Sequence, residues 1–470
     1  MKQLFTVLVI MLLAMMTAGC NVSGTVTSGS TGLSHVKITV TNAETGNFYT
    51  SITTESNGNY RYPSQKGTYT ITPSKDGYTF IPASRNIVVS YASIRNQNFT
   101  AQVAINSGSL DASFGTGGIV TTSIGSSQDY AYALGSQSDG KIVAAGCSYN
   151  GSNFDFAMVR YNLDGSLDTT FGTGGKVVTP VGSGDDRSFA LGIQSDGKIV
   201  AAGVSFNGSN PDFALVRYNS NGSLDTTFGT GGKVTTPVGS YQDYAYALGI
   251  ESDGKIVAAG CSSSDSHSCD FALVKYNTAG SLDTTFGIDG KVITPAGSSS
   301  LYTHTIHALS IQSDGKILAA GSSCNGGINY DYALLRYNSS GSLDTTFGTG
   351  GIVITDVRSA YARALGIQSD GRIVTAGVSY DGSYNNFALV RYNSDGSLDT
   401  TFGAGGEVIT PVVESGDAFA ETLGIQSDGK IVVAGASFNG SNTDFALVRY
   451  NLDGSLDTTF GTGGKVTTPI

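Results

Sequence analysis

The sequence has no tryptophan, and charged residues make up only 13% of its 470 positions. Glycine, by contrast, occurs 64 times. Helical cytosolic enzymes carry more charge and fewer glycines, so this composition favours an exported all-β protein with many tight turns. At this length the chain can hold two or three domains with substantial cores.

Basic residues are too few and too scattered for nucleic-acid binding. The 26 Lys and Arg are spread along the chain, and the formal net charge is −11. Proteins that bind phosphate backbones cluster Lys and Arg, which this sequence does not do. We therefore expect no nucleic-acid partner.

Cysteine is scarce, and none of the five copies has the CxxC or Cys/His spacing that holds zinc. Cys261 and Cys269 flank one predicted hairpin loop, so a disulfide between them is sterically reasonable in an oxidising compartment. Cys147 and Cys324 are interpreted as small buried apolar side chains. No metal and no cofactor is predicted.

The first twenty residues have the layout of a secretory signal, with Lys2 followed by an apolar run over residues 4–16. Thr17-Ala18-Gly19-Cys20 resembles the lipobox of bacterial lipoproteins, although Thr17 replaces the usual Leu. That resemblance implies removal of residues 1–19 and acylation of Cys20, which anchors a protein to membrane. The alternative is an ordinary secretory signal with an incidental Cys.

The residue after Cys20 bears on the location of the protein. Many bacterial lipoproteins kept at the inner membrane carry Asp there, whereas this chain has Asn21. For a Gram-negative source, the resemblance therefore implies an outer-membrane lipoprotein of the cell envelope, facing the periplasm or the surface. No later apolar run is long enough to span a bilayer, so the expected membrane contact is the lipid anchor.

Residues 20–103 are predicted to form a small β-sandwich. Segments 22–26, 36–40 and 69–73 alternate apolar and polar residues, and Asn-Gly and Asp-Gly turns separate the strands. Ser23-Gly24-Thr25-Val26 and Ser56-Asn57-Gly58-Asn59-Tyr60 resemble the carboxypeptidase-regulatory-like family, as does Gly67-Thr68-Tyr69-Thr70-Ile71. The resemblance implies a spacer or accessory module without catalytic residues.

From residue 108 the chain repeats itself. Gly-Ser-Leu-Asp-x-x-Phe-Gly occurs seven times, with its Phe at positions 114, 171, 228, 286, 347, 402 and 460. Between these motifs, Asp-Gly-(Lys/Arg)-Ile recurs six times. Such regular self-similarity decides the fold class before any local pattern does.

One repeat contains four strand signals, at residues 188–194, 198–205, 213–219 and 233–238. An Asp-Gly pair between the first two is the strongest short hairpin signal. Four antiparallel strands per repeat describe a propeller blade, so residues 104–470 are predicted to form a six-bladed β-propeller. The alternative is an open β-solenoid, whose repeats are normally shorter and run in parallel coils.

The fourth strand signal occurs seven times, first at residues 119–122 and last at 465–470, whereas the other three occur six times. Six blades need only six outer strands. One terminal copy is therefore expected to complete the last blade beside the opposite end of the chain and close the ring. The sequence does not decide which copy does so.

The repeats resemble the delta-60 repeat family, a β-propeller domain of unknown function. The matching segments are Gly222–Gly229, Ser195-Asp196-Gly197-Lys198-Ile199 and Phe213–Tyr218. This resemblance implies a fold and no activity.

An Asp and a basic residue recur in every repeat. Their positions are Asp168, Asp225, Asp283, Asp344, Asp399 and Asp457, with Arg160, Arg217, Lys275, Arg336, Arg391 and Arg449. We interpret them as turn and ion-pair residues that shape each blade. The alternative is a calcium loop, but Arg160 stands where its first ligand would be, and positive charge opposes Ca²⁺.

Departures from the repeat are more informative. One position on the first strand changes from three aromatic to three polar residues along the chain: Tyr132, Phe189, Tyr246, His307, Arg363 and Glu421. The last three, with His304 nearby, could bind an anion or perform acid–base chemistry. The alternative is an Arg363–Glu421 salt bridge. The other histidines, His35 and His267, suggest no Ser/His/Asp set.

Loops between second and third strands, such as residues 205–210 and 379–384, combine an aromatic with Asn or Asp and could bind a sugar or a peptide. The leading hypothesis is therefore a non-enzymatic envelope protein that binds a protein or glycan ligand. The second is a polysaccharide lyase or hydrolase that uses His307, Arg363 and Glu421. The third is a passive structural protein of the envelope.

Overall fold

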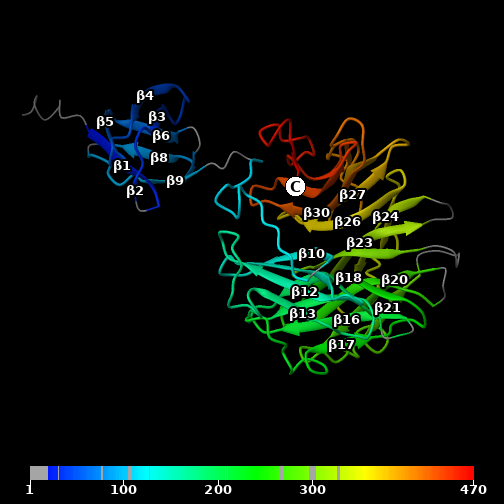
Figure 1. Ribbon diagram of the computed structural model, residues 1–470. Coiled ribbons are helices and arrows are strands. Elements are labelled where there is room, and N and C mark those ends of the chain that lie inside the picture. The colour runs from blue at the N-terminus through cyan, green and yellow to red at the C-terminus, as the bar shows by residue number, and fades with distance from the viewer. Residues whose placement is uncertain are drawn as a thin grey trace, which may run out of the picture. The chain divides into compact units, whose positions relative to one another are not determined.

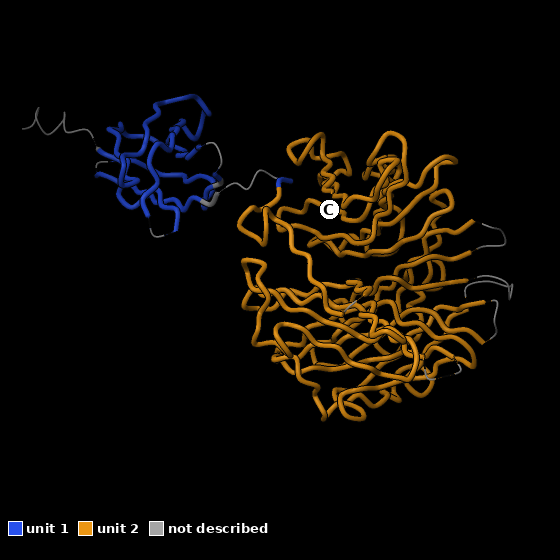
Figure 2. Tube along the Cα trace, in the orientation of Figure 1, with its two compact units in different colours: residues 1–109 blue, residues 110–470 orange. Residues whose placement is uncertain are grey.

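The computed structural model contains β-strands and no helix in the part of the chain that it describes. The described residues are 20–29, 31–75, 78–90, 92–103, 108–125, 127–206, 208, 210–264, 268–295, 303–324 and 329–469. The predicted signal lies outside them. Across these ranges no helix is both long enough and apolar enough to cross a membrane. The chain divides into two compact units, residues 1–109 and 110–470 (Figure 2).

The first unit packs two sheets around one core, as the sandwich prediction requires (Figure 1). One sheet has the order β2-β1-β9-β7, and β5 also pairs with β1; the other has the order β4-β3-β6-β8. Val22, Ile38, Val40 and Ile71 are completely buried between the sheets. The strands are β1 Cys20–Ser28, β2 Thr31–Gly32, β3 Lys37–Asn42, β4 Phe48–Thr53, β5 Asn59–Ser64, β6 Gly67–Ser74, β7 Tyr78–Ile81, β8 Arg85–Val89 and β9 Phe99–Val103.

The second unit contains six four-stranded antiparallel sheets, each built from consecutive strands, and these are the blades of the propeller. The first three blades are β10 Asp129–Ser136, β11 Ile142–Tyr149, β12 Phe154–Tyr161, β13 Lys176–Thr179; β14 Asp186–Ile193, β15 Ile199–Phe206, β16 Pro211–Tyr218, β17 Lys233–Thr236; and β18 Asp243–Ile250, β19 Ile256–Ser262, β20 Asp270–Tyr276, β21 Lys291–Thr294. The last three are β22 Thr305–Ile311, β23 Ile317–Cys324, β24 Tyr330–Tyr337, β25 Ile352–Thr355; β26 Ala360–Ile367, β27 Ile373–Tyr380, β28 Asn385–Tyr392, β29 Glu407–Thr410; and β30 Ala418–Ile425, β31 Ile431–Phe438, β32 Thr443–Tyr450, β33 Lys465–Thr468.

The second blade shows why the repeat folds this way. The ends of its four strands all lie within two residues of the predicted ends. Gly197 of the Asp-Gly turn has a φ of 83°, a left-handed conformation that glycine adopts without steric cost. Every residue of β16 is buried, because neighbouring blades cover both of its faces.

Each first strand contains a β-bulge at the same position. In the second blade the register shifts between Ser188 and Ala190, which leaves Phe189 without a direct partner on β15. Gly203 faces this bulge, and a Cβ added there would lie 1.9 Å from the carbonyl oxygen of Arg187. A bulge re-aims the side chain that it carries, so the glycine opposite is needed for the first strand to approach this closely.

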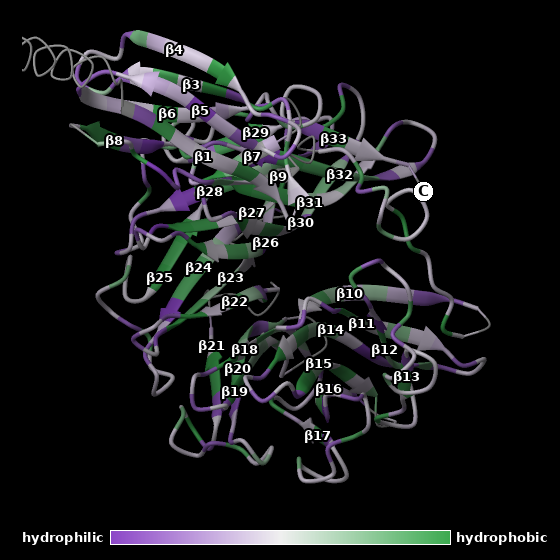
Figure 3. Cartoon of the chain, turned by 90° about the vertical axis from the view of Figure 1, so that its left-hand side faces the viewer, coloured by the Kyte–Doolittle hydropathy of each residue, from purple (hydrophilic) through white to green (hydrophobic). Residues whose placement is uncertain are grey.

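The blades join through five apolar cores, one between each blade and the next. Across the described residues, no buried core joins the last blade to the first. Figure 3 shows the two blades on opposite sides of an opening, with β10 on one side and β30 on the other. The expected closure of the ring is therefore wrong for this structure.

The two terminal copies of the fourth strand differ in their pairing. The C-terminal copy forms β33, which pairs with β32 of its own blade, so the last blade needs no strand from the other end of the chain. The N-terminal copy at residues 119–122 forms no strand. It belongs to residues 110–123, which we call the strap, and the strap packs against the first blade. Gly115 of the strap donates its N–H to the carbonyl of Asp164 at 2.8 Å.

Replacing Gly203 with Ala tests the bulge. We expect Gly203→Ala to lower the free energy of unfolding by about 1–3 kcal/mol, because the new methyl group forces the two strands apart. The control is Gly424→Ala, since no atom lies within 4 Å of a Cβ added at Gly424. Denaturant unfolding measures both. Equal stability of the two variants would contradict the proposed close approach.

Candidate functional site

The six departing positions all lie on the bulges of the first strands. Register shifts flank each of them, from Tyr132 on β10 to Glu421 on β30. Because each blade contributes one bulge at the same height, the six side chains follow one another around the inner strands. Sequence reasoning identified these residues but missed the bulge. The repeated glycine of the second strand, such as Gly203, was the available signal.

The first four side chains form a continuous arc of rings. Ring centroids are 5.3 Å apart between Tyr132 and Phe189, 5.2 Å between Phe189 and Tyr246, and 5.3 Å between Tyr246 and His307. Tyr130 stacks on Tyr132 at 6.1 Å and widens the arc. Tilted rings at these separations attract one another beyond their burial. Tyr132 remains 47% exposed, so solvent reaches the beginning of the arc.

The arc continues into an ion pair. Arg363 Nη1 lies 3.4 Å from Glu421 Oε2, and both side chains are substantially exposed. The structure therefore contains the salt bridge that the sequence left as the alternative. Burial raises the pKa of Glu421, and the positive charge of Arg363 acts in the opposite direction. The Nε atom of Arg363 is buried and has no hydrogen-bond partner in the structure.

His307 is held neutral. Burial lowers the pKa of His307 to about 3, and the charge of Arg363 acts in the same direction. A general acid or base works best when its pKa is near the operating pH. A neutral imidazole of such low pKa at the end of an aromatic arc is better suited to packing and hydrogen bonding than to proton transfer.

The remaining predicted residues lie elsewhere. His304 is buried, with its Nδ1 3.0 Å from Ser323 Oγ and its ring 5.6 Å from that of Phe271, so it is a core residue. His35 contacts Ser34 in the sandwich. His267 lies outside the described residues. Cys261 and Cys269 form a disulfide across the loop between β19 and β20.

Polar residues of the loops between second and third strands bond within their own loops or to the following blade, as Asn153 does to the carbonyl of Gly184 at 2.6 Å. Asp381 accepts hydrogen bonds from the backbone N–H groups of Ser383 and Tyr384, and from the side chain of Asn386. The rings of Tyr380 and Tyr384 remain 43% and 39% exposed. In the loop at 205–210, residues 207 and 209 lie outside the described part of the chain. These loops therefore offer aromatic surface more than free polar groups.

The repeated Asp and Arg residues are occupied by structural contacts. In the second blade, Arg217 Nε lies 2.8 Å from Asp225 Oδ2, and Thr227 donates to the same carboxylate. Arg217 also covers the ring of Phe228 at 4.5 Å. Among the described residues, no group of three or more His, Cys, Asp or Glu is arranged to hold a metal ion. The contacts of Arg217 and Asp225 support the interpretation of the repeated residues as elements of blade geometry.

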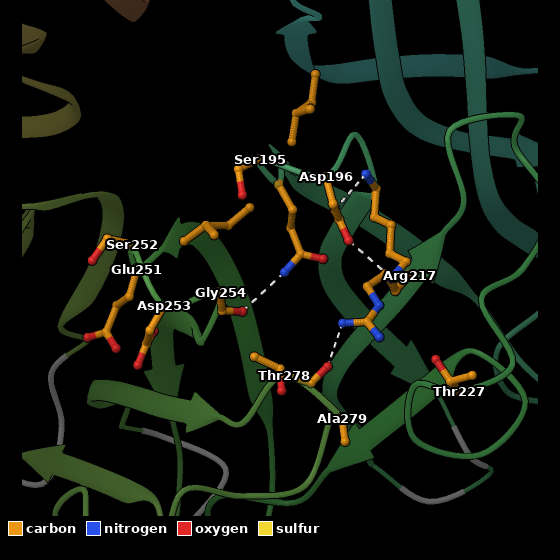
Figure 4. A pocket seen from close by; sticks show the side chains of 14 residues that line it. Ser195, Asp196, Arg217, Thr227, Glu251, Ser252, Asp253, Gly254, Thr278 and Ala279 are labelled. Carbon is orange, nitrogen blue, oxygen red and sulfur yellow. Dashed lines mark hydrogen bonds and ion pairs between the residues drawn. The ribbon is translucent and has the colours of Figure 1, made fainter.

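Two polar grooves lie at the edge that carries the Asp-Gly turns. The larger, of about 780 Å³, lies between the second and third blades and is lined by Gln194, Asp196, Arg217 and Glu251 (Figure 4). The other, of about 670 Å³, lies between the third and fourth blades. Dashed lines in Figure 4 mark bonds that cross between blades, including Gln194 Nε2 to the carbonyl of Gly254 at 3.1 Å. The linings are repeat residues, so we regard the grooves as joints between blades.

The groove between the third and fourth blades includes a paired departure from the repeat, and the larger groove includes one member of that pair, Glu251. Glu251 replaces the Gln found at this position in the other blades, and Lys275 replaces the Arg. Lys275 Nζ lies 2.8 Å from Glu251 Oε1, and both side chains are largely buried. In the first blade, Arg160 instead donates to the amide oxygen of Gln137 at 3.2 Å. The change from Arg to Lys keeps the positive charge and the change from Gln to Glu adds a negative one, so the third blade has an ion pair where the first has a hydrogen bond from a cation to an amide.

Comparison with known proteins agrees with this architecture. Six segments match the family described as domain of unknown function (DUF5122) beta-propeller, at residues 137–171, 194–228, 251–286, 312–347, 368–402 and 426–460. Residues 21–102 match the carboxypeptidase regulatory-like domain. The chain therefore belongs to this β-propeller family, with a carboxypeptidase regulatory-like domain N-terminal to the propeller. No curated protein matched the sequence.

Several solved structures are similar at low sequence identity. A protein of unknown function from Dyadobacter fermentans is 12% identical, with 68% of this chain and 93% of that chain covered and a TM-score of 0.40. A PQQ-bound aldose sugar dehydrogenase from Streptomyces coelicolor is 12% identical, with 70% and 96% covered and a TM-score of 0.36. Chaetomium thermophilum Sqt1, bound to the N-terminus of ribosomal protein L10, is 12% identical, with 70% and 86% covered and a TM-score of 0.37. Likeness at this level assigns no activity.

The low pKa of His307 predicts an acid-sensitive stability. The unfolded chain takes up a proton near pH 6.5, which folded His307 accepts only near pH 3. Stability should therefore fall as the pH drops below 6.5, by roughly 1–2 kcal/mol between pH 7 and pH 5. His307→Phe, which places the residue of the second blade in the fourth, should remove most of this loss. Urea unfolding at both pH values measures it, and an unchanged loss in the variant would contradict the assignment.

The ion pair in the third blade predicts a thermodynamic cycle. Glu251→Gln alone leaves the buried Lys275 without its carboxylate and should cost about 3 kcal/mol of unfolding free energy. Adding Lys275→Arg restores the Gln–Arg pair of the other blades and should recover most of that loss. Thermal and urea unfolding of the two single variants and the double variant give the coupling energy. Additive effects would show that the pair is not coupled.

Proposed function

We propose that this protein is a non-catalytic, exported lipoprotein that binds a glycan at the arc of rings carried by the first strands of its blades. The observation that carries the proposal is the arc of Tyr132, Phe189, Tyr246 and His307, with successive rings 5.2–5.3 Å apart, which ends at the Arg363–Glu421 pair. Sugar rings offer apolar C–H faces that stack on aromatic rings and hydroxyls that hydrogen-bond to nearby polar groups. Sites of this kind combine apolar walls with a few fixed polar groups.

The location is part of the same proposal. The apolar run at residues 4–16 and the segment that ends at Cys20 support export followed by acylation. Asn21 supports sorting to the outer membrane. A glycan-binding module anchored in the cell envelope would meet polysaccharides of the envelope or of the surroundings.

An enzyme has less support from the same residues. His307 has a pKa of about 3, which is far from the pH at which general acids and bases are effective. Glu421 is engaged with Arg363 at 3.4 Å. Neither residue has the arrangement of an activated nucleophile and its base. We therefore favour binding over lyase or hydrolase chemistry.

A glycan array followed by calorimetry tests the proposal. We expect the protein to retain one class of oligosaccharide, and Tyr132→Ala and Tyr246→Ala each to weaken its binding roughly tenfold or more. Tyr49→Ala is the matched control and should leave binding unchanged, because Tyr49 lies in the sandwich and is 37% exposed. Tyr380→Ala, in a loop between a second and a third strand, should leave binding unchanged if the glycan binds at the arc and weaken it if the glycan binds at these loops. Binding that survives both arc variants, or no binding across the array, would refute the proposal.

A further inference from the structure

The last blade presents an uncovered apolar face. On β32 the side chains alternate between buried and exposed, whereas all of β16 in the second blade is buried. Phe445 is 59% exposed, although the equivalent Phe213 and Phe387 are completely buried. A ring left in water to this extent forgoes part of the free energy that burial of apolar surface supplies. The face is built like the five that receive another blade.

The first blade presents the complementary face. Leu134 on β10 is 71% exposed, while its counterparts Leu191 and Leu248 pack into the cores between blades. A Cβ added at Gly192 would meet Leu248 and Ile250 of the next blade, whereas one added at the equivalent Gly424 would meet nothing. The opening between the last and first blades therefore lacks the inner strands that would fill it.

The strap occupies one part of that opening in the manner of an outer strand. Gly115 donates to the carbonyl of Asp164 at 2.8 Å, just as Gly172 of the first blade donates to Asn221 of the second. Tyr161 donates its hydroxyl to Thr122 at 2.9 Å, as Tyr276 does to Thr236. Lys176 reaches the carbonyl of Ser123 at 2.7 Å, and Lys233 makes the matching bond to Pro180. The strap thus stands where the fourth strand of a preceding blade would lie.

This placement prevents the last blade from closing the ring in the regular way. In such a closure Gly461 would need the carbonyl of Asp164, which the strap already uses. Arg449 bonds to Asp457 and Thr459 of its own blade, whereas Arg217 and Arg336 also reach carbonyls in the next blade. The opening therefore has a fourth strand and lacks the first, second and third.

Residues 1–470 contain six sets of first to third strands, and all six are used in blades, so a second copy of these residues leaves two openings and no spare set. We propose that the opening docks a three-stranded antiparallel β-meander from outside these residues, which pairs with the strap to make a seventh blade. This proposal does not rest on the glycan-binding function proposed above.

The faces on either side define the chemistry of the donor. Its first strand should carry small apolar residues on both sides of the bulge, as Ala245 does in the core with the second blade and Ala247 does in the core with the fourth. Its third strand should carry an aromatic residue opposite Thr122, in the register that pairs Phe213 with Thr236. The partner is therefore an edge-exposed, three-stranded β-meander with the pattern of this repeat, added to the strap by β-augmentation.

The test uses the full chain and, as the probe, a synthetic polypeptide with the sequence of residues 181–219, which contains the first three strands of the second blade and neither of the two residues that are monitored. We expect saturable binding by calorimetry, with protection of Leu134 and Phe445 from hydroxyl-radical labelling. Phe445→Asp should weaken binding at least roughly tenfold, while Ile288→Asp, at an 81% exposed position away from the opening, should not.

A version in which the probe is fused to the chain gives a result even if the free probe aggregates. Fusing the same segment after Ile470 should raise the Tm by roughly 5 °C or more, and Phe445→Asp in the parent chain should abolish the gain. The proposal is overturned if neither form of the probe protects Leu134 and Phe445. It is also overturned if both residues are already as protected as Phe213 in the chain alone, since the ring then closes on itself.

Discussion

The structure of the propeller depends on one buried guanidinium per blade, or an ammonium in the third. Arg217 pairs with Asp225 at 2.8 Å, covers the ring of Phe228 and donates to the carbonyl of Thr278 in the following blade at 2.5 Å. A buried charge is costly unless all of its donors are satisfied. The turn of one blade and the position of the next are therefore fixed by the same side chain.

That constraint separates conserved geometry from variable chemistry within the repeat. Where the basic residue is Lys275, its neighbour differs too, and the ammonium pairs with the carboxylate of Glu251 at 2.8 Å. The residue on the bulge is not required to form such an ion pair. Its side chain points away from the pairing of the sheet, so Phe189, His307 and Glu421 can replace one another without altering a blade.

Repetition made most of the fold predictable from sequence. The Asp-Gly turns and alternating runs predicted the strands of each blade, and the aligned departures predicted that Arg363 and Glu421 would be neighbours. Closure of the ring could not be predicted, because strand signals report local pattern and the outcome depends on which segment takes the carbonyl of Asp164. The neutral state of His307 could not be predicted from the sequence either, because it results from burial of the imidazole against residues distant in sequence.

The glycine opposite each bulge has a consequence for how such a protein can change. Gly203 and its counterparts absorb the close approach of the first strand, so the residue on the bulge contributes little to strand pairing. Mutation can then change the side chains on the bulges one blade at a time with little effect on strand pairing. The six bulges act as six separately adjustable positions on a fixed frame, and new specificity can arise by drift among repeats that began alike.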